Sequence, residues 1–186
     1  TSGNKRINKI SIMQLSKDGQ KVVGSKISIP CDCLGVSGGW TPAVHLFTQS
    51  GGKLKFRDED QVFIPDKYPS NQISIGSCNG DFTLDEILSN IPDKLKEFLN
   101  IKKTDYENLE VYSSFNKSKR NIWLLPSDKV IGKTKPFVDY QNDATAKDIK
   151  LALREGFRSI EHVKRYTTTG MGTDQGKLGN MHALGI

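Results

Sequence analysis

The sequence has few cysteines and no long apolar run, and these absences exclude several classes of protein. Its 186 residues include three cysteines, Cys31, Cys33 and Cys78. An odd cysteine count without a signal peptide argues against a disulfide framework and favours a reducing compartment, so we expect a cytoplasmic protein. No apolar run approaches the roughly 18 residues that a membrane-spanning helix needs. We therefore expect no membrane contact.

Three kinds of chemical site are also missing from the sequence. Cys31 and Cys33 form a C-x-C pair, but no second Cys or His pair follows at ligand spacing, so we predict no metal site. Lys and Arg outnumber Asp and Glu by 27 to 21, but aromatic residues are not interleaved with the basic ones as in base-stacking surfaces. No Ser or Cys nucleophile can be assigned to His45. We therefore predict no catalytic residue and no nucleic-acid partner. The excess of basic residues then indicates either another anionic partner or a solvated surface.

Neither end of the sequence has the features of a natural terminus. The chain begins without methionine or a targeting pattern, and it ends inside the helical pattern GNMHALGI. We interpret it as an interior fragment of a longer polypeptide.

The first hundred residues combine β-type patterns with one amphipathic helix. An Asp-Gly turn between Ile7–Leu15 and Lys21–Ile29 predicts a hairpin. Thr83 and Glu86 form a capping-box pattern before the helical segment 86–99, which we expect Pro92 to kink or split. The other predicted elements are strands at 31–36, 53–57 and 62–65 and a short helix after Pro42.

A glycine loop, Gly76-Ser77-Cys78-Asn79-Gly80, precedes that helix. The free amides of a helix N-terminus attract phosphate or a ribose hydroxyl, so the loop is a candidate ligand contact. A single G-x-x-x-G is equally compatible with an ordinary tight turn, and both interpretations remain open.

The composition changes at residues 101–120, which are rich in Lys and Asn. We interpret them as a linker or peripheral excursion between a domain at 1–100 and a small, mainly helical domain at 121–186. In the second domain, Thr145 caps a predicted helix, Ser159 starts another, and a third is expected near Asp174. Lys164, Arg165 and Lys177 lie close to the loop Gly170–Gly176, which is typical of an anion site, although an inert loop in a helical bundle remains possible.

Two long stretches carry a family resemblance. They are CDCLGVSGGWTPAVHLFTQSGGKLKF and FVDYQNDATAKDIKLALREGFRSIEHVKRYTTTGMGTDQGKLGN. Both closely resemble the α subunit of heterotetrameric sarcosine oxidase. The resemblance implies an α+β chain that holds the C-terminal part of a FAD/NAD(P)-binding α/β domain and then a small middle domain. The phosphate fingerprint G-x-G-x-x-G and the folate-binding unit of that family are absent from this sequence.

The resemblance also implies cofactors, partners and contacts. In that family the α subunit holds NAD, and its C-terminal unit holds tetrahydrofolate. FMN lies at the interface with the β subunit. FAD in the β subunit oxidises sarcosine to glycine. The implied partners are the β, γ and δ subunits. The implied NAD contacts are Gly76, Ser77, Gly80, Phe82 and Leu84. The expected contacts with the FMN phosphate or the β-subunit surface are Lys164, Arg165, Thr168, Gly170 and Lys177.

The last segment further resembles the iron–sulfur domain of related amino-acid dehydrogenases, in which four cysteines hold the cluster. Here the first two cysteine positions are Asp139 and Gln141, the third is Asp174, and the last falls near Leu178 or Gly179. Carboxylates and an amide do not replace thiolates on a soft cluster, so we predict the scaffold without iron and sulfur.

Two further interpretations remain open at this point. The chain could be a non-catalytic interaction module whose basic faces dock a partner subunit, or an iron–sulfur carrier, which visible absorbance would reveal. The amine substrate is also open between sarcosine, dimethylglycine and other secondary or tertiary amines.

Overall fold

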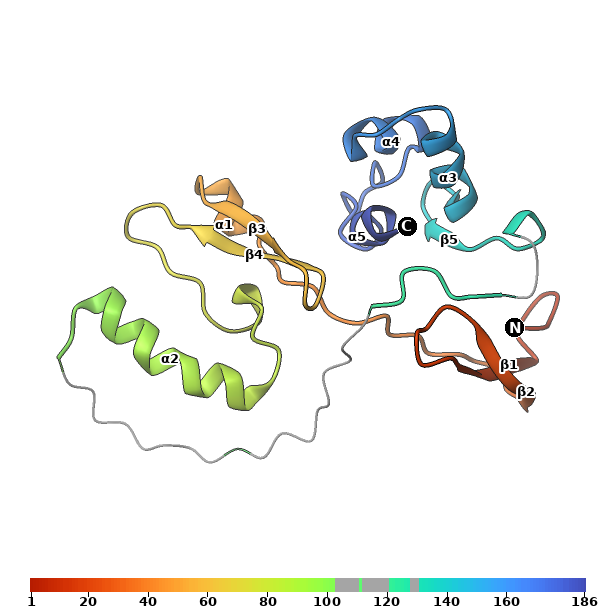
Figure 1. Ribbon diagram of the computed structural model, residues 1–186, viewed down its shortest axis with the longest axis horizontal. Coiled ribbons are helices and arrows are strands. Elements are labelled where there is room, and N and C mark those ends of the chain that lie inside the picture. Colours follow the sequence, from red (N-terminus) through yellow and green to blue (C-terminus); the bar gives the residue numbers. More distant parts are fainter. Residues whose placement is uncertain (103–110, 112–120, 128–130) are drawn as a thin grey trace. The chain divides into compact units, whose positions relative to one another are not determined.

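The computed structural model describes residues 1–102, 111, 121–127 and 131–186, and the chain divides into two compact units (Figure 1). Unit 1 comprises Thr1–Gly35 and Ile122–Ile186, and unit 2 comprises Val36–Asn121. Helices and small antiparallel sheets occur in both units, which is compatible with the predicted α+β class. Apart from 101, 102 and 111, the predicted linker lies outside the described residues. The domain limits at 100 and 120 stay predictions.

Unit 1 begins with the hairpin that the Asp-Gly turn predicts. Strand β1 (Lys9–Leu15) pairs antiparallel with β2 (Val22–Pro30), and Leu15 lies opposite Val22. The Asp18 carboxylate accepts the amide of Gln20 at 3.1 Å, which closes the turn.

The strand predicted at 31–36 is wrong. Leu34 and Val36 are 39% and 83% exposed, and the described chain forms no strand here. A strand persists where a neighbouring strand completes its hydrogen bonds, and none of the described strands pairs with this segment.

Unit 2 is built on a second hairpin and a long helix. Strands β3 (Lys53–Arg57) and β4 (Val62–Lys67) pair antiparallel, as predicted, and the short helix α1 (His45–Gln49) precedes them. Phe47 on α1 is buried and meets the Tyr68 ring edge-on, with the ring centroids 5.0 Å apart. The helix after Pro42 therefore forms, but it starts at His45.

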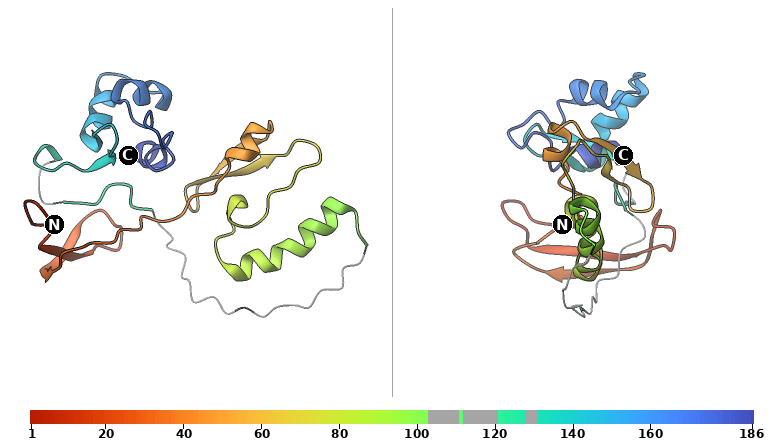
Figure 2. Two further views of the ribbon diagram at one scale, coloured as in Figure 1. Left: turned by 180° about the vertical axis from the view of Figure 1, so that it is seen from behind. Right: turned by 90° about the vertical axis from the view of Figure 1, so that its left-hand side faces the viewer.

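Helix α2 (Leu84–Leu99) confirms the amphipathic pattern, and a one-turn 3-10 helix, η1 (Gly76–Asn79), lies just before it. The Thr83 amide donates to the Glu86 carboxylate at 3.4 Å, as the capping box predicts. The helix runs past Pro92 as one element (Figure 2), so of the two predicted effects, a kink or a split, the split is wrong. The proline removes one amide donor, but the turns on both sides continue the helix. None of the α2 residues is fully buried.

The C-terminal part of unit 1 packs three helices near a very small sheet (Figure 1). Strands β5 (Phe137–Asp139) and β6 (Ala144–Thr145) pair antiparallel after the 3-10 helix η2 (Ile131–Lys133). The predicted helices at 146 and 160 are confirmed as α3 (Ala146–Arg154) and α4 (Ile160–Thr167). The core side chains are Val138, Ala146, Ile149, Ala152, Val163 and Ala183.

The helix predicted to begin near Asp174 is wrong in its start. Helix α5 begins at Asn180 and ends at Gly185. Gln175 has a left-handed backbone, with φ of 55°, which a right-handed helix does not include. The Asp174 carboxylate accepts the Gly176 amide at 3.1 Å and so stabilises a turn in place of a helix.

Candidate functional site

The predicted dinucleotide loop is held in place by an arginine of β3. Arg57 donates from Nε to the Asp60 carboxylate at 2.8 Å and from Nη2 to the backbone oxygen of Gly80 at 2.9 Å. The hydrogen bond with Asp60 is the largest influence on the guanidinium and raises the pKa of Arg57. The end of η1 is thus tied to the β3–β4 hairpin.

The two glycines of this loop are needed by the fold itself. Gly76 and Gly80 have φ of 72° and 87°, a conformation that favours glycine. A Cβ at Gly80 would lie 2.9 Å from Cγ2 of Ile64, so a larger residue would displace the core. These glycines are accounted for without a ligand.

The other three predicted dinucleotide contacts have exposed or half-exposed side chains. Ser77 is exposed, Phe82 is half-buried, and Leu84 at the start of α2 is 55% exposed. They follow one another around the N-terminus of α2, where free amides favour an anion or a hydroxyl. The structure therefore leaves these side chains free to meet another group.

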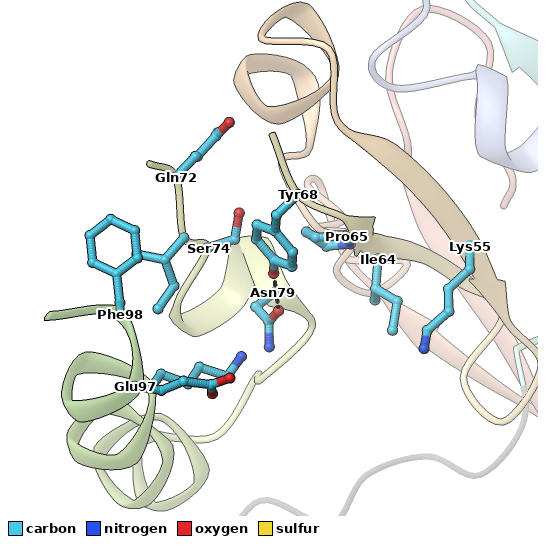
Figure 3. A pocket seen from close by; sticks show the side chains of 11 residues that line it. Lys55, Ile64, Pro65, Tyr68, Gln72, Ser74, Asn79, Glu97 and Phe98 are labelled. Carbon is cyan, nitrogen blue, oxygen red and sulfur yellow. Dashed lines mark hydrogen bonds between the residues drawn. The ribbon is translucent and has the colours of Figure 1, made fainter. Parts of the chain in front are cut away.

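A pocket of about 500 Å³ lies in unit 2 beside this loop (Figure 3). Tyr68 points into it and donates its hydroxyl to Oδ1 of Asn79 at 3.1 Å. Burial raises the pKa of Tyr68. The lining residues from β3, β4, the segment 68–79 and α2 are Lys55, Ile64, Pro65, Tyr68, Gln72, Ile73, Ser74, Asn79, Lys94, Glu97 and Phe98.

The pocket and the predicted contacts are adjacent but differ in their residues. Asn79 lines the pocket, whereas Gly76, Ser77, Gly80, Phe82 and Leu84 do not. Sequence reasoning missed Tyr68 and Lys94. The sequence feature that could have pointed to this side of the pocket is the spacing of Lys94 and Glu97, which places them one turn apart on the same face of α2.

The second candidate site is the glycine loop between α4 and α5, and its centre is the buried side chain of Asp139. This side chain is 6% exposed, and its carboxylate accepts the Gly170 amide at 2.7 Å. It also accepts the amides of Gln141 and Asn142 at 2.8 and 3.1 Å. Burial is the largest single influence on the pKa of Asp139 and acts to raise it. The hydrogen bonds from Gly170, Asn142 and Gln141 together outweigh burial, so the pKa of Asp139 lies below its ordinary value.

The side chains of Gln141 and of Asp174, which is part of the loop, both accept amides of the same loop. The side-chain oxygen of Gln141 accepts from both the amide and the hydroxyl of Thr173, at 2.6 and 3.0 Å. Asp174 accepts the amides of Gly176 and Leu178 at 3.1 and 3.4 Å. All three side chains at the positions compared with cluster cysteines are therefore hydrogen-bonded to backbone amides.

These contacts do not fit an iron–sulfur cluster. The oxygens at the three positions are already engaged, and oxygen ligands do not suit a soft cluster. Within the described ranges, no group of three His, Cys, Asp or Glu side chains is arranged to hold a metal ion.

Of the predicted flavin contacts, Gly170 and Lys177 lie in this loop and the others lie at the end of α4, and their groups differ in availability. Lys164 and Arg165 lie in the last turn of α4, and Lys177 is exposed. The Thr168 hydroxyl donates to the backbone oxygen of Thr167 at 2.6 Å. The amide of Gly170 is bonded to Asp139. Within the described residues no ion pair engages Lys164, Arg165 or Lys177, whereas the Gly170 amide already has an acceptor.

The C-terminal segment, with its three helices, short sheet and glycine loop, matches the model of a known domain family. Residues 133–186 match the family model described as "Sarcosine oxidase A3 domain".

Curated proteins extend the likeness over most of the chain. It is 32% identical over 174 residues to the sarcosine oxidase subunit alpha of Rhizobium meliloti (strain 1021), covering 88% of this chain and 16% of that protein. It is 32% identical over 186 residues to the same subunit of Corynebacterium sp. (strain P-1), covering 95% and 19%, respectively. The resemblance to the α subunit of sarcosine oxidase is confirmed, and the chain spans less than a fifth of these relatives.

No helix among the described residues is long and apolar enough to cross a membrane.

Proposed function

We propose that this chain is part of an oxidoreductase subunit of the sarcosine oxidase α type, acting in the oxidative demethylation of sarcosine to glycine with transfer of the one-carbon unit to tetrahydrofolate. The observation that carries this proposal is the similarity to sarcosine oxidase α subunits, which extends over 88 to 95% of the chain. We assign the protein to the cytoplasm because its three cysteines are free.

Within such a subunit, unit 2 would contribute to NAD binding through the loop at the start of α2. Ser77, Phe82 and Leu84 supply the contacting side chains, since they are exposed or half-exposed around a helix N-terminus. Gly76 and Gly80 shape the loop through their left-handed backbone. The bond from Arg57 to Gly80 supports this role because it fixes the loop before a ligand arrives.

The C-terminal part of unit 1 would face the flavin and the partner subunits. We assign the anion contact to the side chains of Lys164, Arg165 and Lys177, with Thr168 at the edge of the same loop. Gly170 allows the close turn but gives no amide to the ligand, because Asp139 accepts it. The proposed assembly holds FMN at the interface with a β subunit, FAD within that subunit, and γ and δ subunits.

A second candidate function is a non-catalytic module that docks a partner subunit. It is favoured by the apolar side chains left exposed on β2, where Val23, Ile27 and Ile29 are at least 39% exposed. Exposed apolar surface of this kind is typical of contact sites.

One experiment in the source cells separates the two candidates. The coding sequence is disrupted, and oxygen consumption on adding sarcosine is measured in extracts. The proposed function predicts that this consumption is lost and returns when the intact gene is restored. Unchanged consumption in the disrupted strain would reject it. An affinity-tagged protein that recovers a complex whose flavin sarcosine does not reduce would favour the docking module.

A further inference from the structure

The loop from Gly170 to Leu178 has the composition of an anion-binding loop, but its own amides are mostly engaged. Gly170 donates to Asp139, and Thr173 donates to Gln141. The remaining bonded amides, Met171, Gln175, Gly176, Lys177 and Leu178, donate to acceptors at Thr168, Gly172 and Asp174. A loop that recruits phosphate presents such amides to solvent. Here the acceptors come from the chain itself.

The Asp139 carboxylate is the acceptor for several backbone amides. It lies at the end of β5, is 6% exposed, and accepts three backbone amides at 2.7 to 3.1 Å. The side-chain amide of Asn142 donates to the same carboxylate at 3.3 Å. Among the residues that the structure describes, the hydrogen-bond partners of this carboxylate are all amides, so backbone and side-chain dipoles balance its negative charge.

The Asn180 side chain also packs against the loop. A Cβ added at Gly170 or Gly176 would collide with the Asn180 side chain, and both glycines have positive φ, 72° and 74°. The loop therefore contacts both Asn180 and the carboxylate of Asp139, with no space at either glycine for a side chain.

We infer that Asp139 is a built-in anion that locks the glycine loop, and that removing its carboxylate would convert the loop into a binding site for a small carboxylate such as formate. The lock brings together β5 and the loop after α4, 31 residues apart in sequence. Nothing in this inference depends on sarcosine oxidation, since it concerns contacts within this chain.

Amide hydrogen exchange, measured by NMR on the full chain, tests the lock. In the wild type, the Gly170 amide should exchange at least about tenfold more slowly than that of Gly172, which has no acceptor among the described residues. Asp139→Asn should speed exchange at Gly170 by about tenfold or more, because a charged acceptor is replaced. Glu155→Gln removes the same charge from an exposed site at the end of α3 and should leave Gly170 unchanged.

Anion rescue tests the second half of the inference. Asp139→Ala is compared in sodium formate and in sodium chloride at equal ionic strength, and formate should restore slow exchange at Gly170 while the wild type does not respond. No rescue in a folded variant would overturn the inference. If the variant does not fold, the exchange rates of Gly170 and Gly172 in the wild type still test the inference. Equal exchange rates at these two amides would overturn it. Protection of the wild-type loop amides by inorganic phosphate would also overturn it, because the loop would then recruit an external anion.

Discussion

Two aspartates in unit 1 stabilise local structure by accepting hydrogen bonds, and they differ in what they hold. Asp139 joins a strand end to a distant loop. Asp148 acts within three residues: its carboxylate accepts the amide and the hydroxyl of Thr145 at 2.8 and 2.7 Å at the start of α3. The hydrogen bond from the Thr145 hydroxyl is the largest influence and lowers the pKa of Asp148. A lowered pKa means that the folded state favours the charged form.

At the residue scale, Asp148→Ala should lower the free energy of unfolding by about 1 kcal/mol at pH 7, the usual contribution of a helix cap. Because the folded pKa lies below the ordinary value of 3.8, this contribution is present above pH 3.8 and is lost as the pH falls through the lowered pKa. Urea unfolding of wild type and variant should therefore differ at pH 7 and converge below pH 3.8.

The matched control is Glu155→Ala, which removes an exposed carboxylate from the other end of the same helix. It should change the unfolding free energy by less than about 0.5 kcal/mol. If the two variants lose equal stability at pH 7, the capping role of Asp148 is wrong.

At the scale of an element, helix α2 allows two leucines to be compared, one at each of its ends. Leu84 and Leu99 stand at its two ends and are each 55% exposed. Leu84 belongs to the proposed dinucleotide contact, whereas Leu99 lies at the far end. The two side chains match in type and exposure, so they differ mainly in position.

If the proposed contact is correct, Leu84→Ala together with Ser77→Ala should weaken NAD binding by about tenfold, because apolar contact and a hydroxyl are lost from the site. Leu99→Ala should leave the affinity within about twofold of wild type. NADH fluorescence titration of the full assembled protein measures both. Equal affinities in all three proteins would remove the loop from the dinucleotide site, while circular dichroism checks that α2 is intact.

At the scale of the whole molecule, the proposed flavin contact of the cations near the glycine loop is tested in the proposed complex. If Lys164 and Arg165 contact the FMN phosphate as proposed, replacing both by Ala in the complex should lower FMN retention by about tenfold or more, because two positive charges would be lost from that contact. The flavin that stays with the complex after gel filtration is quantified by absorbance.

The control for this double variant is Lys150→Ala with Arg154→Ala, which removes the same charge from the exposed face of α3. It should retain FMN as the wild type does. If both double variants retain FMN equally, Lys164 and Arg165 have no specific role. An equal loss would mean that net charge governs FMN retention, and no loss would mean that these cations do not hold the flavin.

Local patterns in the sequence determined most of the individual elements. The Asp-Gly turn predicted β1–β2, and the capping boxes at Thr83 and Thr145 predicted the starts of α2 and α3. These features succeed because they depend on residues within a few positions of one another. The family resemblance was likewise readable from two long stretches and is confirmed by the comparisons.

The tertiary structure alone decided which groups of the glycine loop are free. The sequence showed cations beside Gly170–Gly176 and indicated an anion site, but Asp139 lies 31 residues from Gly170 and no local pattern joins them. The start of α5 was missed partly for a similar reason, because Gln141 accepts the Thr173 amide from 32 residues away. The local bond from Gly176 to Asp174 stabilises the same turn. A hydrogen-bond acceptor brought in from a distant segment changes both the backbone conformation and the chemistry that the loop can offer.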